Sequence, residues 1–258
     1  MLNLGVVDLT MQAAIALLLL LLTSFSAQAQ TTPAEFIDAA TVVDGLVVDM
    51  RYFGADNFVG TRIDGYEAPR CLLTRRAAVA LSAAQRDLAR RGLGLKVLDC
   101  YRPTRAVAHF ARWARNLADV ARKADYYPDV DKRDLFRLGY IAERSGHSRG
   151  STVDITLVRR AAGSDPDVGT RDMGTRDMGT PDMGTPDLGT PDMGTRFDFF
   201  SPKSWPGDIG VGKPARRNRA LLAAAMARAG FQAYDKEWWH FTLRNEPFPA
   251  SYFNFPVR

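Results

Sequence analysis

The chain has 258 residues, of which 46% are hydrophobic, 10% aromatic and 24% charged, and its formal net charge is +5. This composition excludes a disordered chain, a collagen and a multi-pass membrane protein, and the length predicts one domain or at most two. Because the charge is modest and no block of Lys or Arg concentrates it, we expect no nucleic-acid partner.

The N-terminal segment has the pattern of a secretory signal. Residues 13–22 are an unbroken apolar run, about half of the roughly 20 residues that span a bilayer as a helix. Ala27-Gln28-Ala29 follows as an A-x-A cleavage site. We therefore expect a signal peptide over residues 1–29, export, and no stable membrane insertion after cleavage. No Lys or Arg precedes the apolar run, so an uncleaved anchor and a true start at Met11 are the alternatives.

The first predicted elements of the mature chain are a strand, a loop and a helix. Residues 41–53 are β-branched and partly alternating, which predicts a strand or hairpin. Residues 54–70 are rich in Gly, Asp, Asn and Pro and predict a loop. Thr74 is placed to cap a helix that runs to Arg91, with apolar residues at helical spacing and Gly92 after its end.

Strands and helices then mix without a regular alternation. Strands are predicted over residues 94–100, 153–158 and 237–243, and a second helix begins at Pro103, a residue that suits the first helical position. An Ala- and Leu-rich helix is predicted over residues 215–229. The lack of a strand–helix–strand rhythm favours an α+β fold over a doubly wound sheet.

Residues 166–195 are six tandem pentapeptides, PDVGT, RDMGT, RDMGT, PDMGT, PDLGT and PDMGT. A Gly in every unit and a Pro in four of them exclude a helix or a long strand. The regular Asp suggests calcium binding, but the ligand density is too low and the calcium-loop pattern is missing. We interpret the tract as a tandem expansion in a surface loop, because lengthening a loop costs little free energy.

Cys71 and Cys100 are the two cysteines of the chain, too few for a disulfide scaffold or a four-cysteine zinc site. In an oxidising compartment such a pair is often bridged. A bridge here would stabilise the fold by roughly 3 kcal/mol in the chain-entropy model. We expect this disulfide in an exported protein, and two free buried thiols are the alternative.

Two of the three histidines lie in motifs that also hold a carboxylate. The first motif, residues 145–154, reads SGHSRGSTVD and contains His147 and Asp154; the second is Glu237-Trp238-Trp239-His240. A catalytic zinc takes three protein ligands of N or O type and keeps one open position. His147, Asp154 and His240 therefore predict a site for one Zn²⁺ per chain, and unrelated surface or core histidines are the alternative.

Two further residues suit a hydrolytic reaction. Glu237 can take a proton from a water that zinc activates and deliver it to a leaving amine. It lies three residues before His240, so a regular strand would point the two side chains to opposite faces, and we expect an irregular strand start. Arg102 lies between a predicted strand and helix, where it can point into a cleft and hold an oxyanion. A solvated arginine is the alternative.

The sequence resembles the zinc D-alanyl-D-alanine dipeptidases of the VanX type over roughly residues 40–258. The resemblance rests on SGHSRGSTVDITL, EWWHFTLRNEPFPASYFNFPV, DCYRPTRAV, RYFGADNFVG and DGYE. This family is part of a wider zinc peptidase group that includes D,D-carboxypeptidases and the Hedgehog signalling domain. It implies one α+β domain over residues 30–258, with a small, mainly antiparallel sheet flanked by helices and a zinc cleft.

The resemblance also implies roles for individual residues. His147, Asp154 and His240 match the zinc ligands, Glu237 matches the catalytic base and acid, and Arg102 matches the residue that stabilises the transition state. The positions that match the lining of the substrate pocket are Tyr52, Tyr66, Ser145 and Asp198. Asp198 would face the amino end of a dipeptide, or be an ordinary loop residue. No site role is expected for His109, a helix residue, for Arg149, which orients its loop, or for Trp238 and Trp239, which pack.

The implied activity is zinc-dependent hydrolysis of D-alanyl-D-alanine to two D-alanines, with a small dipeptide as the substrate. The pentapeptide tract departs from the family, except that its last unit and residues 196–198 resemble it. The signal peptide and the cysteine pair differ from cytoplasmic members and predict a periplasmic protein. The alternatives are a murein D,D-carboxypeptidase or endopeptidase acting on longer peptides, and a zinc-bound binding module without turnover.

Overall fold

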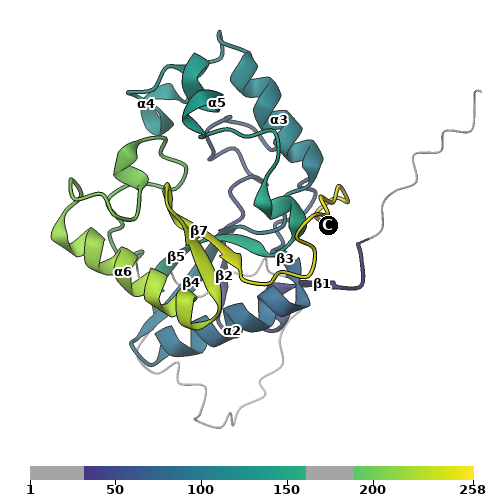
Figure 1. Cartoon of the computed structure of the whole chain (residues 1–258), viewed down its shortest axis with the longest axis vertical. Coiled ribbons are helices and arrows are strands. Elements are labelled where there is room, and N and C mark those ends of the chain that lie inside the picture. Colours follow the sequence, from purple (N-terminus) through teal and green to yellow (C-terminus); the bar gives the residue numbers. More distant parts are fainter. Residues whose placement is uncertain (1–31, 161–188) are drawn as a thin grey trace, which may run out of the picture. The chain divides into compact units, whose positions relative to one another are not determined.

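The computed structural model describes residues 32–160 and 189–258 (Figure 1). The predicted signal peptide, the alternative start at Met11 and the first part of the pentapeptide tract lie outside the described residues. Among the helices of the described ranges, none combines the length and the apolar character needed to cross a membrane.

The central element is a five-stranded sheet in the order β2–β4–β5–β7–β6. Its strands are β2 (Val47–Val48), β4 (Leu93–Asp99), β5 (Thr152–Arg159), β6 (Phe231–Tyr234) and β7 (Glu237–Leu243). The β2–β4 pair is parallel and the other three pairs are antiparallel. A separate antiparallel pair joins β1 (Phe36–Asp38) to β3 (Leu72–Thr74). The chain is therefore α+β, as predicted, and most of the strand pairing in its described part is antiparallel.

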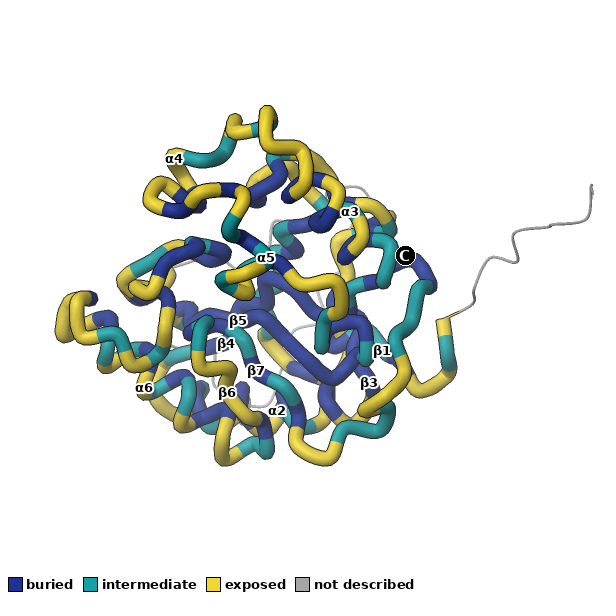
Figure 2. The backbone as a smooth tube through the Cα atoms, turned by 45° about the horizontal axis from the view of Figure 1, so that its top comes forward, coloured by how far each residue is buried: buried dark blue, intermediate teal, exposed yellow. Residues whose placement is uncertain are grey.

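Helices lie on both sides of this sheet (Figure 1). On one side, α2 (Arg75–Ala89) contacts β4, and α6 (Lys213–Arg228) contacts β5, β6 and β7 as well as α2. On the other side lie α3 (Thr104–Arg115) and the single-turn helices α4 (Lys123–Tyr126) and α5 (Leu135–Leu138). Both central strands, β4 and β5, are buried along almost their whole length (Figure 2).

Most predicted elements are confirmed to within about two residues at each end. Helix α2 begins after Thr74, whose Oγ1 accepts a hydrogen bond from the backbone N–H of Ala77, and it buries Leu81 and Leu88 on its apolar face. Helix α3 begins one residue later than predicted, because Pro103 is its N-cap. The strand pair β1–β3 and strand β6 were not predicted.

The predicted strand over residues 41–53 is wrong except at β2. The backbone N–H groups of Asp49 and Arg51 donate to the carbonyls of Val97 and Leu98, so two alternate residues bind consecutive carbonyls of β4. This spacing does not continue a regular ladder. The segment still follows β4, and it carries the buried Tyr52 to a cavity whose lining also includes Arg102 and Glu237.

The last repeat of the pentapeptide tract packs into the fold, so its position on the surface is a wrong prediction. The repeats up to residue 188 lie outside the described residues, and for them the interpretation as a surface-loop expansion stays a prediction. Met193 is buried, and its backbone carbonyl accepts a hydrogen bond from Nε of Arg219 at 2.7 Å. Gly194 has φ +80°, and a Cβ there would lie 2.8 Å from Cβ of Val211. Oγ1 of Thr195 accepts a hydrogen bond from the indole N–H of Trp238 at 2.8 Å.

Candidate metal centre and catalytic cleft

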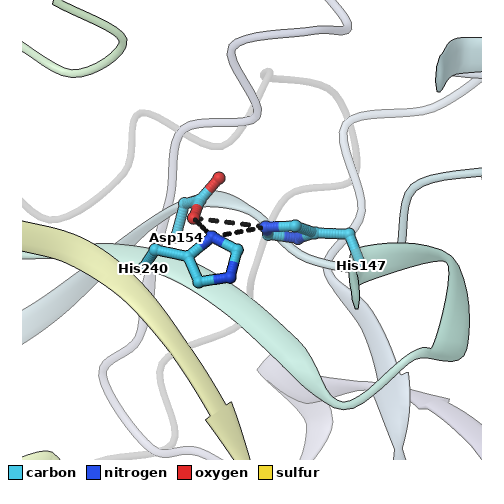
Figure 3. A group of neighbouring side chains, drawn as sticks. All are labelled: His147, Asp154 and His240. Carbon is cyan, nitrogen blue, oxygen red and sulfur yellow. Dashed lines mark hydrogen bonds and ion pairs between the residues drawn. The ribbon is translucent and has the colours of Figure 1, made fainter. Parts of the chain in front are cut away.

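Three side chains from three separate segments meet at one point (Figure 3). His147 lies on the 3-10 turn Gly146–Arg149, Asp154 on β5 and His240 on β7, where Asp154 and His240 are direct partners in the strand register. Nε2 of His147 lies 3.3 Å from Nδ1 of His240 and 3.2 Å from Oδ1 of Asp154. Nδ1 of His240 lies 3.1 Å from the same oxygen. The structure thus brings together the three residues predicted as ligands.

Local backbone geometry brings His147 back toward β5. Oγ of Ser145 accepts a hydrogen bond from the backbone N–H of His147 and caps the turn. Gly150 then adopts φ +80°, and a Cβ at this position would lie only 2.1 Å from the ring of Phe36. The chain can therefore reverse here only with glycine, which is why the motif reads His-Ser-Arg-Gly before the strand.

The three donor atoms fit a zinc ion. Zinc bonds to N and O ligands are about 2.0–2.1 Å long, so two ligands of a tetrahedral ion lie about 3.3 Å apart. The observed separations are 3.1 to 3.3 Å. Oδ1 of Asp154 is buried, and within residues 32–160 and 189–258 it accepts no hydrogen bond of regular geometry; its polar neighbours there are the ring nitrogens of His147 and His240. A buried carboxylate oxygen in this position is costly unless a cation satisfies it.

The orientation of His147 also suits a metal ligand. Its Nδ1 lies 2.7 Å from the backbone oxygen of Cys100. Because a carbonyl only accepts hydrogen bonds, Nδ1 carries the proton and Nε2 presents its lone pair to the other two donor atoms. Ligating histidines are commonly oriented in this way by a partner on the other ring nitrogen.

The charges of the cluster favour a cation between these atoms. Burial alone would raise the pKa of Asp154, but His147 and His240 hold it well below its ordinary value. Burial alone would lower the pKa of His240, but its contacts with Asp154 and Glu237 outweigh burial and raise that pKa to about 9. The raised pKa of His240 reflects the negative charge of Asp154 and Glu237 beside it, and a divalent metal ion would also offset that charge.

Glu237 lies at the edge of the cluster. Its Oε2 is 3.3 Å from Nδ1 of His240, although the two residues are three apart on β7. The register between β6 and β7 shifts beside Tyr234, the residue that pairs with Glu237. The expected irregular start of the strand is therefore present, and it turns the carboxylate toward the donor atoms.

Arg102 lies between two buried carboxylates. Its Nε and Nη2 donate to Oδ2 of Asp99 at 2.9 and 2.8 Å, and Nη2 lies 3.5 Å from Oδ2 of Asp154. The guanidinium carbon is 5.1 Å from the ring centres of both Tyr52 and Phe110. These contacts hold the guanidinium group of Arg102 beside the donor cluster.

A cavity of about 320 Å³ opens over the cluster. Its lining includes Arg102, Asp154, Glu237 and His240, and also three of the four residues predicted to line a substrate pocket, namely Tyr52, Ser145 and Asp198. The volume lies near the lower end of the roughly 300–1,000 Å³ typical of small-molecule sites.

Asp198 is buried in the wall of this cavity and has φ +58°, an uncommon conformation for a residue with a side chain. Its Oδ2 accepts a hydrogen bond from the hydroxyl of Tyr52 at 2.8 Å. Burial raises the pKa of Asp198 well above its ordinary value, and the charge of Asp154 adds to the shift. A cationic group in the cavity would offset both effects.

Tyr66 does not line the cavity. It is buried behind Arg102, where its hydroxyl donates to Oδ1 of Asp99 at 2.6 Å, so the structure does not support its predicted contact with substrate. His109 lies on α3, as predicted, and pairs with the exposed Asp64; the clustered donor residues in the described part of the chain are the other two histidines and Asp154. Arg149 pairs with Glu246 but also lines the cavity.

The two tryptophans of the second motif, Trp238 and Trp239, are buried and pack edge to face against each other, as expected. Cys71 and Cys100 are joined by a disulfide that closes a sequence separation of 29.

Asp99 was not predicted to have a role. It is the last residue of β4 and it is fully buried. It contacts Arg102 and Tyr66, and its Oδ2 lies 3.4 Å from Nδ1 of His147. The signal in the sequence was a carboxylate at the end of an apolar strand, three residues before the arginine. A buried charge at such a position requires a partner of opposite charge.

Known proteins resemble this chain along most of its length. A family model described as D-ala-D-ala dipeptidase matches residues 32–180 and 182–258. The D-alanyl-D-alanine dipeptidase of Enterococcus faecium is 37% identical over 217 residues, which are 84% of this chain and 95% of that protein. The enzyme of the same name from Streptomyces coelicolor is 37% identical over 86% of this chain and 98% of its own. The one from Escherichia coli is 31% identical over 84% and 88%.

Proposed function

The chain belongs to the D-Ala-D-Ala dipeptidase family, and from this we propose that it is a zinc-dependent dipeptidase that hydrolyses D-alanyl-D-alanine to two D-alanines. The observation that supports zinc most directly is the group of three donor atoms 3.1 to 3.3 Å apart, one of which is a buried carboxylate oxygen that accepts no regular hydrogen bond from the described part of the chain. His147, Asp154 and His240 would hold the ion. When bound, zinc supplies a Lewis acid that polarises the peptide carbonyl and acidifies a water molecule.

The protein side chains account for the remaining requirements of peptide hydrolysis. Glu237 is the proposed base, which accepts a proton from the attacking water and then donates it to the leaving amine. Its Oε2 lies 3.3 Å from Nδ1 of His240 in the donor cluster. Arg102 is the proposed stabiliser of the negative charge that develops on the carbonyl oxygen, and its Nη2 lies 3.5 Å from Oδ2 of Asp154 in the same cluster.

The cavity supports a short, zwitterionic substrate. Asp198 and the hydroxyl of Tyr52 form a buried acidic end that suits the ammonium group of a free dipeptide. A longer peptide has an acylated nitrogen at that position, so it would leave the carboxylate of Asp198 without a cation in a buried site. The volume of about 320 Å³ also favours a small substrate over a strand of cell-wall peptide.

The decisive experiment is hydrolysis of three substrates by the mature, zinc-loaded protein. We expect release of D-alanine from D-Ala-D-Ala and little turnover of its L,L isomer or of a cell-wall pentapeptide. Preferred cleavage of the pentapeptide would instead assign a murein carboxypeptidase or endopeptidase. Zinc binding without turnover of any of the three would assign a binding module, although such a module has no use for the base at Glu237.

We propose the periplasm as the place of action. The signal pattern of residues 1–29 supports export, and the pairing of Cys71 with Cys100 is compatible with an oxidising compartment. Fractionation of cells that express the full chain tests this, with the N-terminus of the recovered protein expected near Ala29. Recovery of the intact chain in the cytoplasm would contradict it.

A further inference from the structure

Asp99 binds the predicted catalytic arginine with a buried carboxylate. The residue is 0% exposed. Its Oδ2 accepts from Nε and Nη2 of Arg102, and its Oδ1 accepts from the hydroxyl of Tyr66 at 2.6 Å. Both carboxylate oxygens are therefore engaged, and neither points to solvent. Charge-assisted hydrogen bonds of this kind are about twice as strong as neutral ones and hold a guanidinium plane in a fixed orientation.

A second carboxylate competes for the same guanidinium. Nη2 of Arg102 is only 3.5 Å from Oδ2 of Asp154, a proposed zinc ligand. A full ion pair with Arg102 would withdraw negative charge from Asp154 and so weaken its bond to a metal ion. In the structure Arg102 is closer to Asp99 than to Asp154, at 2.8 Å against 3.5 Å.

We propose that Asp99 is a positioning residue of the dipeptidase site. It holds the guanidinium of Arg102 beside the reacting carbonyl and keeps it from forming a close ion pair with Asp154. This inference rests on the proposed function, since it gives Arg102 a role in the transition state. It adds a residue that acts through Arg102. Oδ2 of Asp99 also lies 3.4 Å from Nδ1 of His147, a proposed zinc ligand, so the experiments separate an effect through Arg102 from one through His147.

Zinc affinity tests the competition for Arg102 without relying on turnover. In Asp99→Asn the arginine loses its charged partner and is expected to move to Asp154, so the zinc dissociation constant should rise at least about fivefold in a chelator competition. Adding Arg102→Ala in the same chain should return the affinity to within about threefold of wild type, because the competing cation is gone. Equal zinc loss in the single and double variants would mean that Asp99 acts through His147 and not through Arg102, and it would overturn the proposal. Wild-type affinity in Asp99→Asn would overturn it as well.

Chemical rescue tests the positioning role in catalysis. Guanidinium ion added to Arg102→Ala should occupy the place beside Asp99 and restore activity at least about tenfold over the unrescued variant, whereas urea, which is neutral, should not. The double variant Asp99→Asn/Arg102→Ala should not respond to guanidinium. Equal rescue in both chains, or none in Arg102→Ala, would contradict the role of Asp99.

A matched control variant and the wild type distinguish failure of this proposal from misfolding and from failure of the proposed function. Asp87 also accepts from two arginines, Arg90 and Arg228, but on the surface away from the site, so Asp87→Asn should keep zinc affinity and kcat. Circular dichroism and thermal melting show which variants fold. If Asp99→Asn does not fold, rescue of Arg102→Ala by guanidinium can still be measured, because that variant keeps Asp99. If the wild type itself binds zinc but does not cleave D-Ala-D-Ala, the proposed function fails, and the zinc competition still decides whether Asp99 restrains Arg102.

Discussion

The backbone carbonyl of Cys100 accepts a hydrogen bond from Nδ1 of His147 at 2.7 Å. Cys100 is also one half of the disulfide to Cys71, and Arg102 follows it by two residues. The covalent link therefore ends at the residue that orients one proposed metal ligand, directly before the segment that carries the proposed oxyanion stabiliser. This arrangement gives the disulfide a consequence for the site as well as for the stability of the fold.

The first prediction concerns that disulfide. The exported protein should show no alkylatable thiol in mass spectrometry without reductant. The double variant Cys71→Ala/Cys100→Ala should lose roughly 3 kcal/mol of unfolding free energy, because the unfolded chain regains the entropy of an open loop. Denaturant titration measures the loss. Two free thiols in the exported wild type would contradict the prediction.

The second prediction concerns the metal. The purified protein should contain one zinc per chain, and His147→Ala, Asp154→Ala and His240→Ala should each lose it, because each removes one of three protein ligands. Elemental analysis after dialysis measures the content. His109→Ala is the matched control, since this histidine pairs with Asp64 outside the cluster and should leave zinc in place. Full zinc occupancy in all three ligand variants would refute the assignment.

The third prediction concerns Glu237. Glu237→Gln keeps the size of the side chain but removes the base, so kcat for D-Ala-D-Ala should fall by at least about 10²-fold, the low end for general acid–base catalysis. The zinc content should remain near wild type, since Glu237 is not one of the three ligands. Parallel measurement of kcat and bound zinc checks both parts, and a kcat close to that of the wild type would exclude the proposed role.

The fourth prediction concerns Asp198. Asp198→Asn should raise KM for D-Ala-D-Ala by about tenfold or more with a smaller effect on kcat, because it removes the counter-charge of the substrate ammonium group. N-acetyl-D-Ala-D-Ala, which has no ammonium group, should react poorly with both proteins. Because burial raises the pKa of Asp198, KM of the wild type should also rise as the pH falls and the carboxyl becomes protonated. A KM unaffected by the substitution would exclude the contact.

The fifth prediction concerns the pentapeptide tract. Deleting Asp167 through Pro191 removes 25 residues and joins Pro166 to Asp192, so a complete PDMGT unit still precedes Arg196. We expect unchanged zinc content, kcat within about threefold, and a stability equal to wild type or higher by up to about 1 kcal/mol from the shorter loop. Kinetics on D-Ala-D-Ala and on a pentapeptide check this. A tenfold rise in KM with new activity on the pentapeptide would instead make the tract a lid.

A substitution in the last repeat is expected to have the opposite effect on stability from the deletion of the preceding repeats. Gly194→Ala should destabilise the protein by about 1–3 kcal/mol, because a Cβ at φ +80° is strained and would contact Val211. A thermal melt of both variants distinguishes the embedded unit from the repeats that precede it.

Much of the fold was predictable from local patterns. The helix over residues 75–89 follows from a capping threonine and apolar residues at helical spacing. Strands β5 and β7 follow from runs of β-branched and aromatic residues, and β4 follows from a short, mainly apolar run between a glycine and a polar loop. The segment 41–53 has the same composition, but its backbone binds β4 with irregular spacing. Only two residues of this segment therefore form a strand. The composition could not predict this, because it does not determine which backbone carbonyls a segment binds.

The sequence alone indicated which residues could form a metal site, because only a few residue types bind zinc, and the chain has three histidines, of which two lie in motifs with a carboxylate. Tertiary structure decided the contacts between distant segments. The register of β5 against β7 places Asp154 opposite His240, and the end of β4 places Asp99 against Arg102. Tertiary structure also decided that Tyr66 lies buried behind Arg102, in contact with Asp99, and that Met193 is buried in the core. Pairing and burial of this kind depend on segments far apart along the chain, and no local pattern records them.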